Sequence, residues 1–210
     1  CLHRLRTDRI DLYQVHYLDG KTPVAQMMEA LIRHRDKGDI LAIGLSNIRT
    51  EDIPALAPYR EHLAGFQNHY SLAHRIDEAA MQQISTNLQL APLTWGSLGQ
   101  GILTGKYDAN VHFEKDDRRS REVYDNFYGE KLCKNLRIVE AMRPIAAAHG
   151  VPVSSVAVRW ILDHLPGSVV ITGVKSPRQA KENALAMSFT LSASELQTLN
   201  RVSADESMAT

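Results

Sequence analysis

The sequence predicts an α/β fold in which short apolar strands alternate with helices. Its five apolar runs are nearly continuous, which indicates burial on both faces, as parallel sheets require. Alternation of this kind within one domain leaves a closed eight-stranded barrel or an open doubly wound sheet. No Gly-x-Gly-x-x-Gly follows a run, which counts against the open sheet. The runs are Ile10–His16, Ile40–Leu45, Ala64–Gln67, Leu88–Trp95 and Ser168–Gly173.

Local start signals place helices between these runs. Thr22 offers a capping hydroxyl before Pro23 at the first helical position, and the apolar stripe that follows ends near Gly38. Thr50 begins another helix, because the two acidic residues after it suit the positive end of a helix dipole. Two later starts fit the capping box, Ser176 to Gln179 and Ser192 to Glu195.

Two further segments have a character of their own. Leu2 and Leu5 stand at helical spacing and suggest the tail of a helix that is entered midway. The polar stretch from Gly99 to about Asn126 predicts a surface loop, since strand and helix patterns resume after it. We therefore expect residues 1–210 to form a single domain.

Composition argues against several classes of partner. The chain has 24 Lys and Arg against 24 Asp and Glu, so no net field attracts nucleic acid or an anionic membrane. No apolar run approaches the length of a membrane span. The two cysteines, Cys1 and Cys133, fit neither a disulfide framework nor a metal site. We expect a cytoplasmic protein without a bound metal.

Polar side chains follow the ends of the apolar runs. In a barrel of parallel strands all these ends open onto one face, where ligand and catalytic groups gather. The sequence therefore predicts one site that collects them. The residues are His16, Ser46, Asn47, Gln67, Asn68, Trp95, Gly96, Ser97, Lys175 and Ser176.

Five longer segments carry a family resemblance, namely DLYQVH, GDILAIGLSNI, FQNHYSL, TWGSLGQGILTGKY and ITGVKSPRQAKEN. In their order and spacing they resemble the aldo-keto reductase family, and the loop after TGKY resembles the potassium-channel beta-subunit-like branch with its bacterial relatives. The resemblance implies an incomplete (β/α)8 TIM barrel, with about five of eight βα units plus C-terminal helices. It also implies NADP(H) as cofactor and the reduction of aldehydes or ketones to alcohols.

The resemblance assigns roles to the first strand ends. His16 matches the active-site histidine that donates a hydrogen bond to the substrate carbonyl oxygen. Ser46, Asn47 and Gln67 match residues that hydrogen-bond the nicotinamide carboxamide, which offers one acceptor and two donor hydrogens. The alternatives are a structural histidine at a strand end and, for Ser46 and Asn47, the capping of the next helix.

The fourth run supplies a flat ring and a small-residue loop. Trp95 stands where the family commonly has a tyrosine that stacks on the nicotinamide, although a Trp in an apolar run is also typical of a core. The loop after it matches the pyrophosphate-binding loop, where small residues let backbone N–H groups approach charged oxygens. A simple turn is the alternative. The loop residues are Gly96, Ser97, Leu98, Gly99 and Gln100.

The last strand end and the helix after it match the adenosine end of the cofactor. Lys175, Ser176 and Arg178 suit the 2′-phosphate, because two cations and the N-terminus of a helix converge there, which favours NADP(H) over NAD(H). Gln179 replaces a frequent arginine, so it serves the phosphate less directly or only the capping box. The other matching positions are Gly173, Glu182 and Asn183.

The catalytic set is incomplete in this sequence. The family's aspartate, general-acid tyrosine and lysine all match positions before the region where this chain begins, and neither Tyr17 nor Tyr70 is a convincing substitute. We therefore expect the chain alone to be inactive as a reductase. The alternatives are a non-catalytic NADP(H)-binding regulatory or sensor subunit and a non-functional fragment. The expected partner is a small carbonyl substrate, and the sequence is also compatible with an oligomer.

Overall fold

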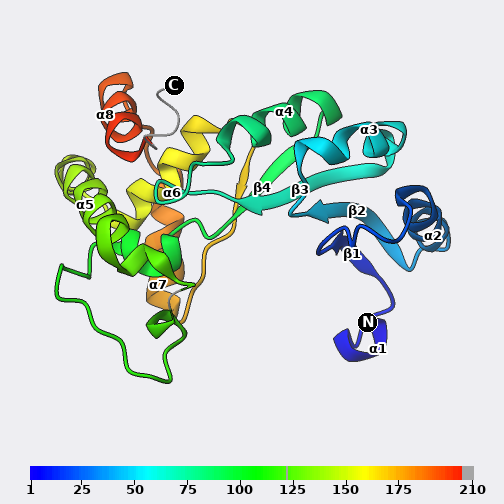
Figure 1. Cartoon of the computed structure of the whole chain (residues 1–210), viewed down its shortest axis with the longest axis horizontal. Helices are drawn as coiled ribbons and strands as arrows, with labels where there is room; N and C mark the ends of the chain where they lie inside the picture. The colour runs from blue at the N-terminus through cyan, green and yellow to red at the C-terminus, as the bar shows by residue number, and fades with distance from the viewer. Residues whose placement is uncertain (122, 205–210) are drawn as a thin grey trace. The chain divides into compact units, whose positions relative to one another are not determined.

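The computed structural model describes residues 1–121 and 123–204 and contains the expected alternation of strands and helices (Figure 1). The strands are β1 (Ile10–Val15), β2 (Ile40–Ser46), β3 (Leu63–His69), β4 (Ala91–Trp95) and β5 (Val169–Val170). They follow one another in the sheet in the order β1-β2-β3-β4-β5. The pairings of β1 with β2 and of β2 with β3 are parallel.

The helices between these strands are mostly short. The α-helices are α1 (Leu2–Leu5), α2 (Val24–Asp36), α3 (Ile53–Leu56), α4 (Glu78–Leu88), α5 (Gly129–His149), α6 (Val153–His164), α7 (Pro177–Ala184) and α8 (Ala193–Ser203). The 3-10 helices are η1 (Thr50–Asp52), η2 (Ala57–His62), η3 (Gly99–Thr104), η4 (Arg118–Ser120), η5 (Asp125–Phe127) and η6 (Leu185–Met187).

The chain divides into two compact units. Unit 1 comprises Cys1–Asn68 and Glu78–Leu93, and unit 2 comprises His69–Asp77 and Thr94–Thr210. Strand β4 begins in unit 1 and ends in unit 2. Each unit has its own apolar core, so each is described by itself.

Unit 1 is built on the parallel strands β1, β2 and β3. Ile43 of β2 and Phe66 of β3 are fully buried, as continuous apolar runs predict. Strand β1, at the end of the strand order, has no buried residue. The expectation of burial on both faces is therefore wrong for this strand.

The helix starts of unit 1 follow the sequence signals only in part. Helix α2 begins at Val24 with Pro23 as its N-cap, and the hydroxyl of Thr22 donates to Asp19 instead of capping the helix. The α2 helix ends at Asp36, two residues before Gly38, which has a left-handed φ of 83°. A helical turn does begin at Thr50, but as the 3-10 helix η1.

Unit 2 packs three helices around a buried tryptophan. Helix α5 packs against α6 and α8, and Trp160 of α6 is fully buried. The indole N–H of Trp160 donates to Asn200 Oδ1 of α8 at 2.8 Å. The Arg75 guanidinium lies 5.2 Å from the Trp160 ring centroid and donates to the Ser203 hydroxyl of α8 at 2.9 Å. These contacts hold α6 and α8 together.

The two predicted capping boxes have different outcomes. At α8, Ser192 Oγ accepts from Glu195 N and Glu195 Oε2 accepts from Ser192 N, which confirms that box. At α7, Ser176 Oγ accepts from Gln179 N, but Gln179 Oε1 accepts from Lys175 N at 2.6 Å instead. The second box is therefore half formed.

The predicted loop of residues 99–126 is more ordered than its polar composition suggests. It opens with η3, where Ile102 and Leu103 are fully buried. Further on, the Arg119 guanidinium lies 4.4 Å from the Phe113 ring centroid and forms an ion pair with Asp117. Hydrogen bonds from Arg119 hold the pKa of that carboxyl well below its usual range.

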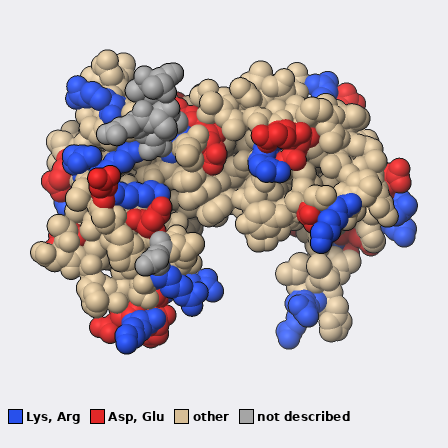
Figure 2. Space-filling model, in the orientation of Figure 1, with Lys and Arg blue, Asp and Glu red and all other residues tan. Residues whose placement is uncertain are grey.

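The surface charges and the lengths of the helices can be compared with the expectations from composition. On the face shown in Figure 2, Lys and Arg side chains lie among Asp and Glu side chains. In the described part of the chain, no single helix has both the length and the apolar character to cross a membrane. One pair, α5 and α6, meets both criteria together but is bent by 94°.

The Trp160 contact gives a test of the unit 2 core. Asn200→Ala leaves the indole N–H of Trp160 buried without its acceptor, so we expect the free energy of unfolding to fall by about 1–3 kcal/mol. Urea denaturation measures this change. Gln197→Ala is the matched control, because Gln197 is an exposed amide on the same helix. Equal effects of the two substitutions would contradict the assignment.

Candidate nucleotide-binding site

Three of the predicted residues meet at the carboxyl ends of β2 and β3. The Ser46 hydroxyl donates to the backbone carbonyl oxygen of Gln67 at 2.8 Å, and the Asn47 backbone N–H donates to the same oxygen at 2.9 Å. Ser46 also lies opposite Gln67 in the parallel register. The structure thus brings these three residues together at one edge of the sheet, where parallel strands end.

Asn47 connects this group to the end of β1. Its side-chain Nδ2 donates to the backbone carbonyl of His16 at 3.0 Å and to the Ser46 hydroxyl at 3.2 Å. Its backbone has a φ of 54°, a left-handed conformation that Asn tolerates better than most residues. Asn47 does not cap the next helix, because the N-cap of η1 is Arg49.

Sequence reasoning missed Gln14 of β1. Its Nε2 donates to Gln67 Oε1 at 3.2 Å, which orients the side-chain amide of Gln67. A Cβ on Gly44 would lie 2.9 Å from Gln14 Cγ, so the glycine of β2 leaves room for this side chain. The signal in the sequence was a polar residue inside an apolar run.

His16 follows β1 directly and is exposed. Its ring centroid lies 4.4 Å from that of Tyr17, and the two rings are tilted by 45°. Tyr17 is 59% exposed, whereas Tyr70 is fully buried and stacked on Trp160. His16 therefore lies at the same sheet edge as Asn47, whose side chain donates to the backbone carbonyl of His16.

In unit 2, Trp95 ends β4 and the predicted phosphate loop turns sharply after it. Gly96 has a φ of 71°, and its carbonyl accepts from Gly99 N at 2.8 Å. Ser97 is buried, with its hydroxyl 3.1 Å from that of Thr94. Gly99 and Gln100 also have positive φ values, 54° and 55°. Leu98 is the N-cap of η3.

His69, at the end of β3, is a second residue that sequence reasoning missed. Its imidazole stacks on the Trp95 indole, with centroids 4.2 Å apart and ring planes 11° apart. Burial, with a smaller effect from the charge of His74, lowers the pKa of His69 from 6.5 to about 4. The side chain is therefore a neutral imidazole near neutral pH.

The predicted adenosine-end residues lie in α7 and in the segment that leads into it. Ser176 caps the helix, and Gln179 binds the backbone N–H of Lys175. Lys175 is exposed, while Arg178 forms an ion pair with Glu182 at 2.5 Å. Gly173 is exposed in the segment between β5 and α7, and Asn183 follows Glu182 in the helix.

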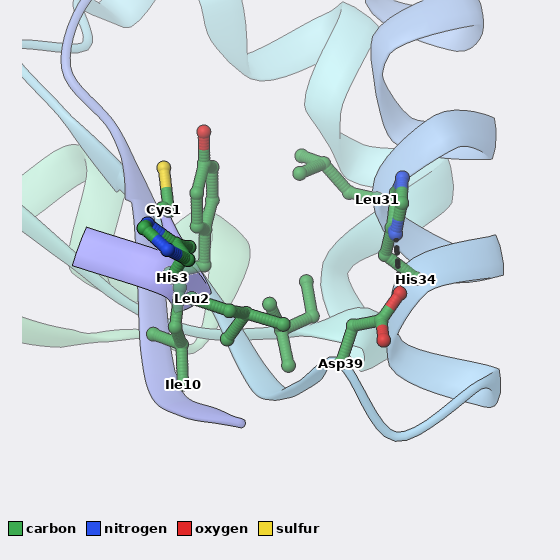
Figure 3. A pocket seen from close by; sticks show the side chains of 9 residues that line it. Cys1, Leu2, His3, Ile10, Leu31, His34 and Asp39 are labelled. Carbon is green, nitrogen blue, oxygen red and sulfur yellow. Dashed lines mark hydrogen bonds and ion pairs between the residues drawn. The ribbon is translucent and has the colours of Figure 1, made fainter. Parts of the chain in front are cut away.

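A cavity of about 400 Å³ in unit 1 lies elsewhere (Figure 3). Ile10 and Ile40, the first residues of β1 and β2, line it, so it lies at the opposite strand ends from Ser46. His34 and Asp39 are hydrogen bonded at its wall at 2.8 Å. No predicted site residue lines this cavity. Among the described residues, no three His, Cys, Asp or Glu side chains are arranged to hold a metal ion.

The comparisons with known proteins place the chain in a family. The model of the aldo/keto reductase family matches residues 1–204, so the chain belongs to that family. It is 32% identical over 205 residues to an aldo-keto reductase of Bacillus subtilis, covering 96% of this chain and 60% of the relative. A probable voltage-gated potassium channel subunit beta of Arabidopsis thaliana is 31% identical over 194 residues, covering 89% and 58%. Both the family and the branch that the sequence suggested are confirmed.

Solved structures agree. A glycerol dehydrogenase from Gluconobacter oxydans matches with a TM-score of 0.85 and 30% identity, covering 96% of this chain and 60% of its own. An aldo-keto reductase from Klebsiella pneumoniae in complex with NADPH matches with a TM-score of 0.71 and 27% identity, covering 96% and 61%. The fold class, an incomplete (β/α)8 barrel, is confirmed. The chain spans about 60% of the length of the relatives it matches.

The left-handed backbone of Asn47 gives a test of the unit 1 site. Asn47→Ala removes the hydrogen bond to the His16 carbonyl. It also puts alanine, which tolerates a positive φ less well than asparagine or glycine, at this position. Asn47→Gly, the matched control, removes the same bond but relieves the backbone. In urea denaturation we expect the free energy of unfolding of Asn47→Ala to be about 1 kcal/mol lower than that of Asn47→Gly. Equal stabilities would show that the backbone conformation is not strained.

The pKa of His69 gives a prediction on acid stability. In the unfolded chain His69 takes up a proton below about pH 6.5, but in the folded chain only near about pH 4. The unfolded state therefore binds more protons in this window, and stability falls as the pH drops through it. His69→Phe removes the titration, so its unfolding free energy should change less between the two ends of this window. A parallel decline in both proteins would contradict the shift.

Proposed function

We propose that this chain binds NADP(H) and contributes the cofactor site and His16 to an enzyme that reduces aldehydes or ketones to alcohols. The observation that carries the proposal is the convergence of Ser46 and Asn47 on the Gln67 carbonyl, with Gln14 bonded to the Gln67 amide. Hydroxyl and amide groups brought together in this way suit a carboxamide, which both donates and accepts hydrogen bonds.

Buried polar atoms without partners support a ligand of this chemistry. Gln14 Oε1 and Asn183 Nδ2 are buried and have no hydrogen-bond partner among the described residues. Buried polar atoms are normally satisfied, so such atoms call for an explanation. A nicotinamide nucleotide carries both donors and acceptors. Gln14 would then face the nicotinamide end with Gln67, and Asn183 the adenosine end.

Each predicted residue then has a role in the proposed site. Ser46, Asn47 and Gln67 orient the nicotinamide, and Trp95 offers a flat ring for stacking. The backbone of the loop from Gly96 through Ser97, Leu98 and Gly99 to Gln100 binds the pyrophosphate. Around α7, cations and polar side chains bind the adenosine and its 2′-phosphate. These residues are Gly173, Lys175, Ser176, Arg178, Gln179, Glu182 and Asn183.

His16 is the proposed catalytic residue of this chain. When bound, NADPH supplies the hydride for the carbonyl carbon. The His16 imidazole donates a hydrogen bond to the carbonyl oxygen and so stabilises the negative charge that develops there. None of the chain's seven tyrosines matches the family's general acid. We therefore propose that the chain alone does not reduce a carbonyl substrate.

The wider expectations from the sequence belong to the same proposal. We propose that residues 1–210 act as one domain and that the substrate is a small carbonyl compound. Equal numbers of acidic and basic residues argue against nucleic acid or an anionic membrane as partner. Two cysteines that are both free suit a reducing, cytoplasmic setting.

A second candidate is a cofactor-binding regulatory subunit. The observation that favours it is the similarity to the probable potassium channel subunit beta of Arabidopsis thaliana. Such a subunit needs NADP(H) binding but no general acid. Binding of NADPH without oxidation in the presence of carbonyl compounds, by a protein that also contains the Tyr and Lys of the family, would favour this candidate over the reductase.

Titration with NADPH, followed by nucleotide fluorescence, tests the proposal. We expect the chain to bind NADPH, and Lys175→Ala to raise its Kd about tenfold without changing that for NADH, because one charge-assisted contact to the 2′-phosphate is lost. Lys181→Ala is the matched control, since Lys181 is another exposed lysine, within α7 itself, and is not among the residues proposed to bind the cofactor. Absence of NADPH binding by the wild-type chain would refute the proposed function.

A further inference from the structure

Three aromatic side chains of unit 2 form a continuous stack that includes Trp95, the ring proposed to stack on the nicotinamide. His69 lies between Trp95 and His74. Its ring is 4.2 Å from the Trp95 ring and 3.9 Å from the His74 ring, with interplanar angles of 11° and 16°. The outer ring is held in turn, because His74 Nε2 lies 3.3 Å from Asp77 Oδ2.

Backbone hydrogen bonds fix the residues that carry these rings. Tyr70 N–H, next to His69, donates to the Trp95 carbonyl at 3.1 Å. Ser71 and His74 exchange two backbone bonds, of 3.1 and 2.9 Å, in a tight turn that brings His74 back to His69. The stack therefore rests on ordered backbone and not on side-chain packing alone.

The edge of His69 also determines what can follow Trp95. A Cβ on Gly96 would lie 2.4 Å from both His69 Cδ2 and His69 Nε2, so no side chain fits there. Gly96 also has a positive φ of 71°. The imidazole thus contacts the indole with its face and the first residue of the proposed phosphate loop with its edge.

We propose that His69 is a positioning residue for NADP(H), whose imidazole ring fixes the plane of the Trp95 indole and the turn at Gly96. This inference rests on the proposed function. Because His69 covers one face of the indole, a nicotinamide ring that stacks on Trp95 must use the opposite face. The contribution of His69 comes from its flat aromatic ring, since Nε2 has no hydrogen-bond partner among the described residues.

Charged groups around the stack are consistent with a neutral ring. His74 and Lys131 disfavour a positive charge on His69, and Asp77 and Asp125 favour one, but burial is the largest effect. The imidazole can therefore stack as an uncharged aromatic ring near neutral pH.

Two substitutions separate the ring from its polarity. His69→Phe keeps an aromatic face but no nitrogen, whereas His69→Gln keeps reach and polarity but no ring. Since an aromatic pair contributes on the order of 1 kcal/mol, we expect His69→Gln to raise the Kd for NADPH about three- to tenfold and His69→Phe to leave it near the wild-type value. His149→Gln is the matched control, because that imidazole also has an aromatic neighbour, Phe189, and a carboxylate partner, Glu195.

A ligand-free measurement accompanies the titration. The chain has two tryptophans, and Trp160 is fully buried, so acrylamide quenching of fluorescence reports mainly on Trp95. Removal of the ring by His69→Gln should increase quenching, and His69→Phe should restore it. His149→Gln should change neither quenching nor affinity.

These experiments distinguish a failure of the inference about His69 from a failure of the proposed function. If the wild-type chain binds NADPH but His69→Gln binds it equally well, the inference is overturned and the proposed function stands. The inference also fails if His69→Gln retains affinity and His69→Phe loses it, because polarity and not the ring then matters. No NADPH binding by the wild-type chain overturns both.

Discussion

The hydrogen bonds that converge on the backbone carbonyl of Gln67 are the constraint on which the unit 1 site depends. Two donors from the end of β2, the Ser46 hydroxyl and the Asn47 N–H, reach the one oxygen. This arrangement requires β2 and β3 to be parallel, with Ser46 opposite Gln67 after the register shift between Ile43 and Gly44. A slip by one residue would turn each side chain to the other face of the sheet.

Asn47 extends this constraint to the first strand. Because its backbone is left-handed, its side chain can reach back to the His16 carbonyl instead of following the chain forward. The position of the proposed catalytic histidine is thus tied to the residues proposed to bind the nicotinamide. Substitutions in β2 or β3 would therefore affect the residues of this unit that we propose to bind the substrate carbonyl and the cofactor together.

In unit 2, aromatic stacking holds the residues at the end of β4, whereas in unit 1 hydrogen bonds hold the ends of the strands. Trp95 ends a strand, and its indole stacks on the imidazole of His69. The same imidazole explains why the next residue is glycine, because its edge occupies the space that a side chain would need. The long segment after β4 is ordered by a similar device, with Arg119 over Phe113 and paired with Asp117.

The sequence by itself determined the alternation of strands and helices, the capping box at Ser192 and the family, because apolar period, caps and motif order are properties of neighbouring residues. It also grouped Ser46, Asn47 and Gln67, since parallel strands end at one edge. Only the tertiary structure decided the bond between Gln14 and Gln67, which are 53 residues apart, and the stack of His69 on Trp95. Such partners follow from strand register and ring orientation, which packing sets and local sequence does not encode. For the same reason the exposure of β1 and the half-formed box at Ser176 could not be predicted.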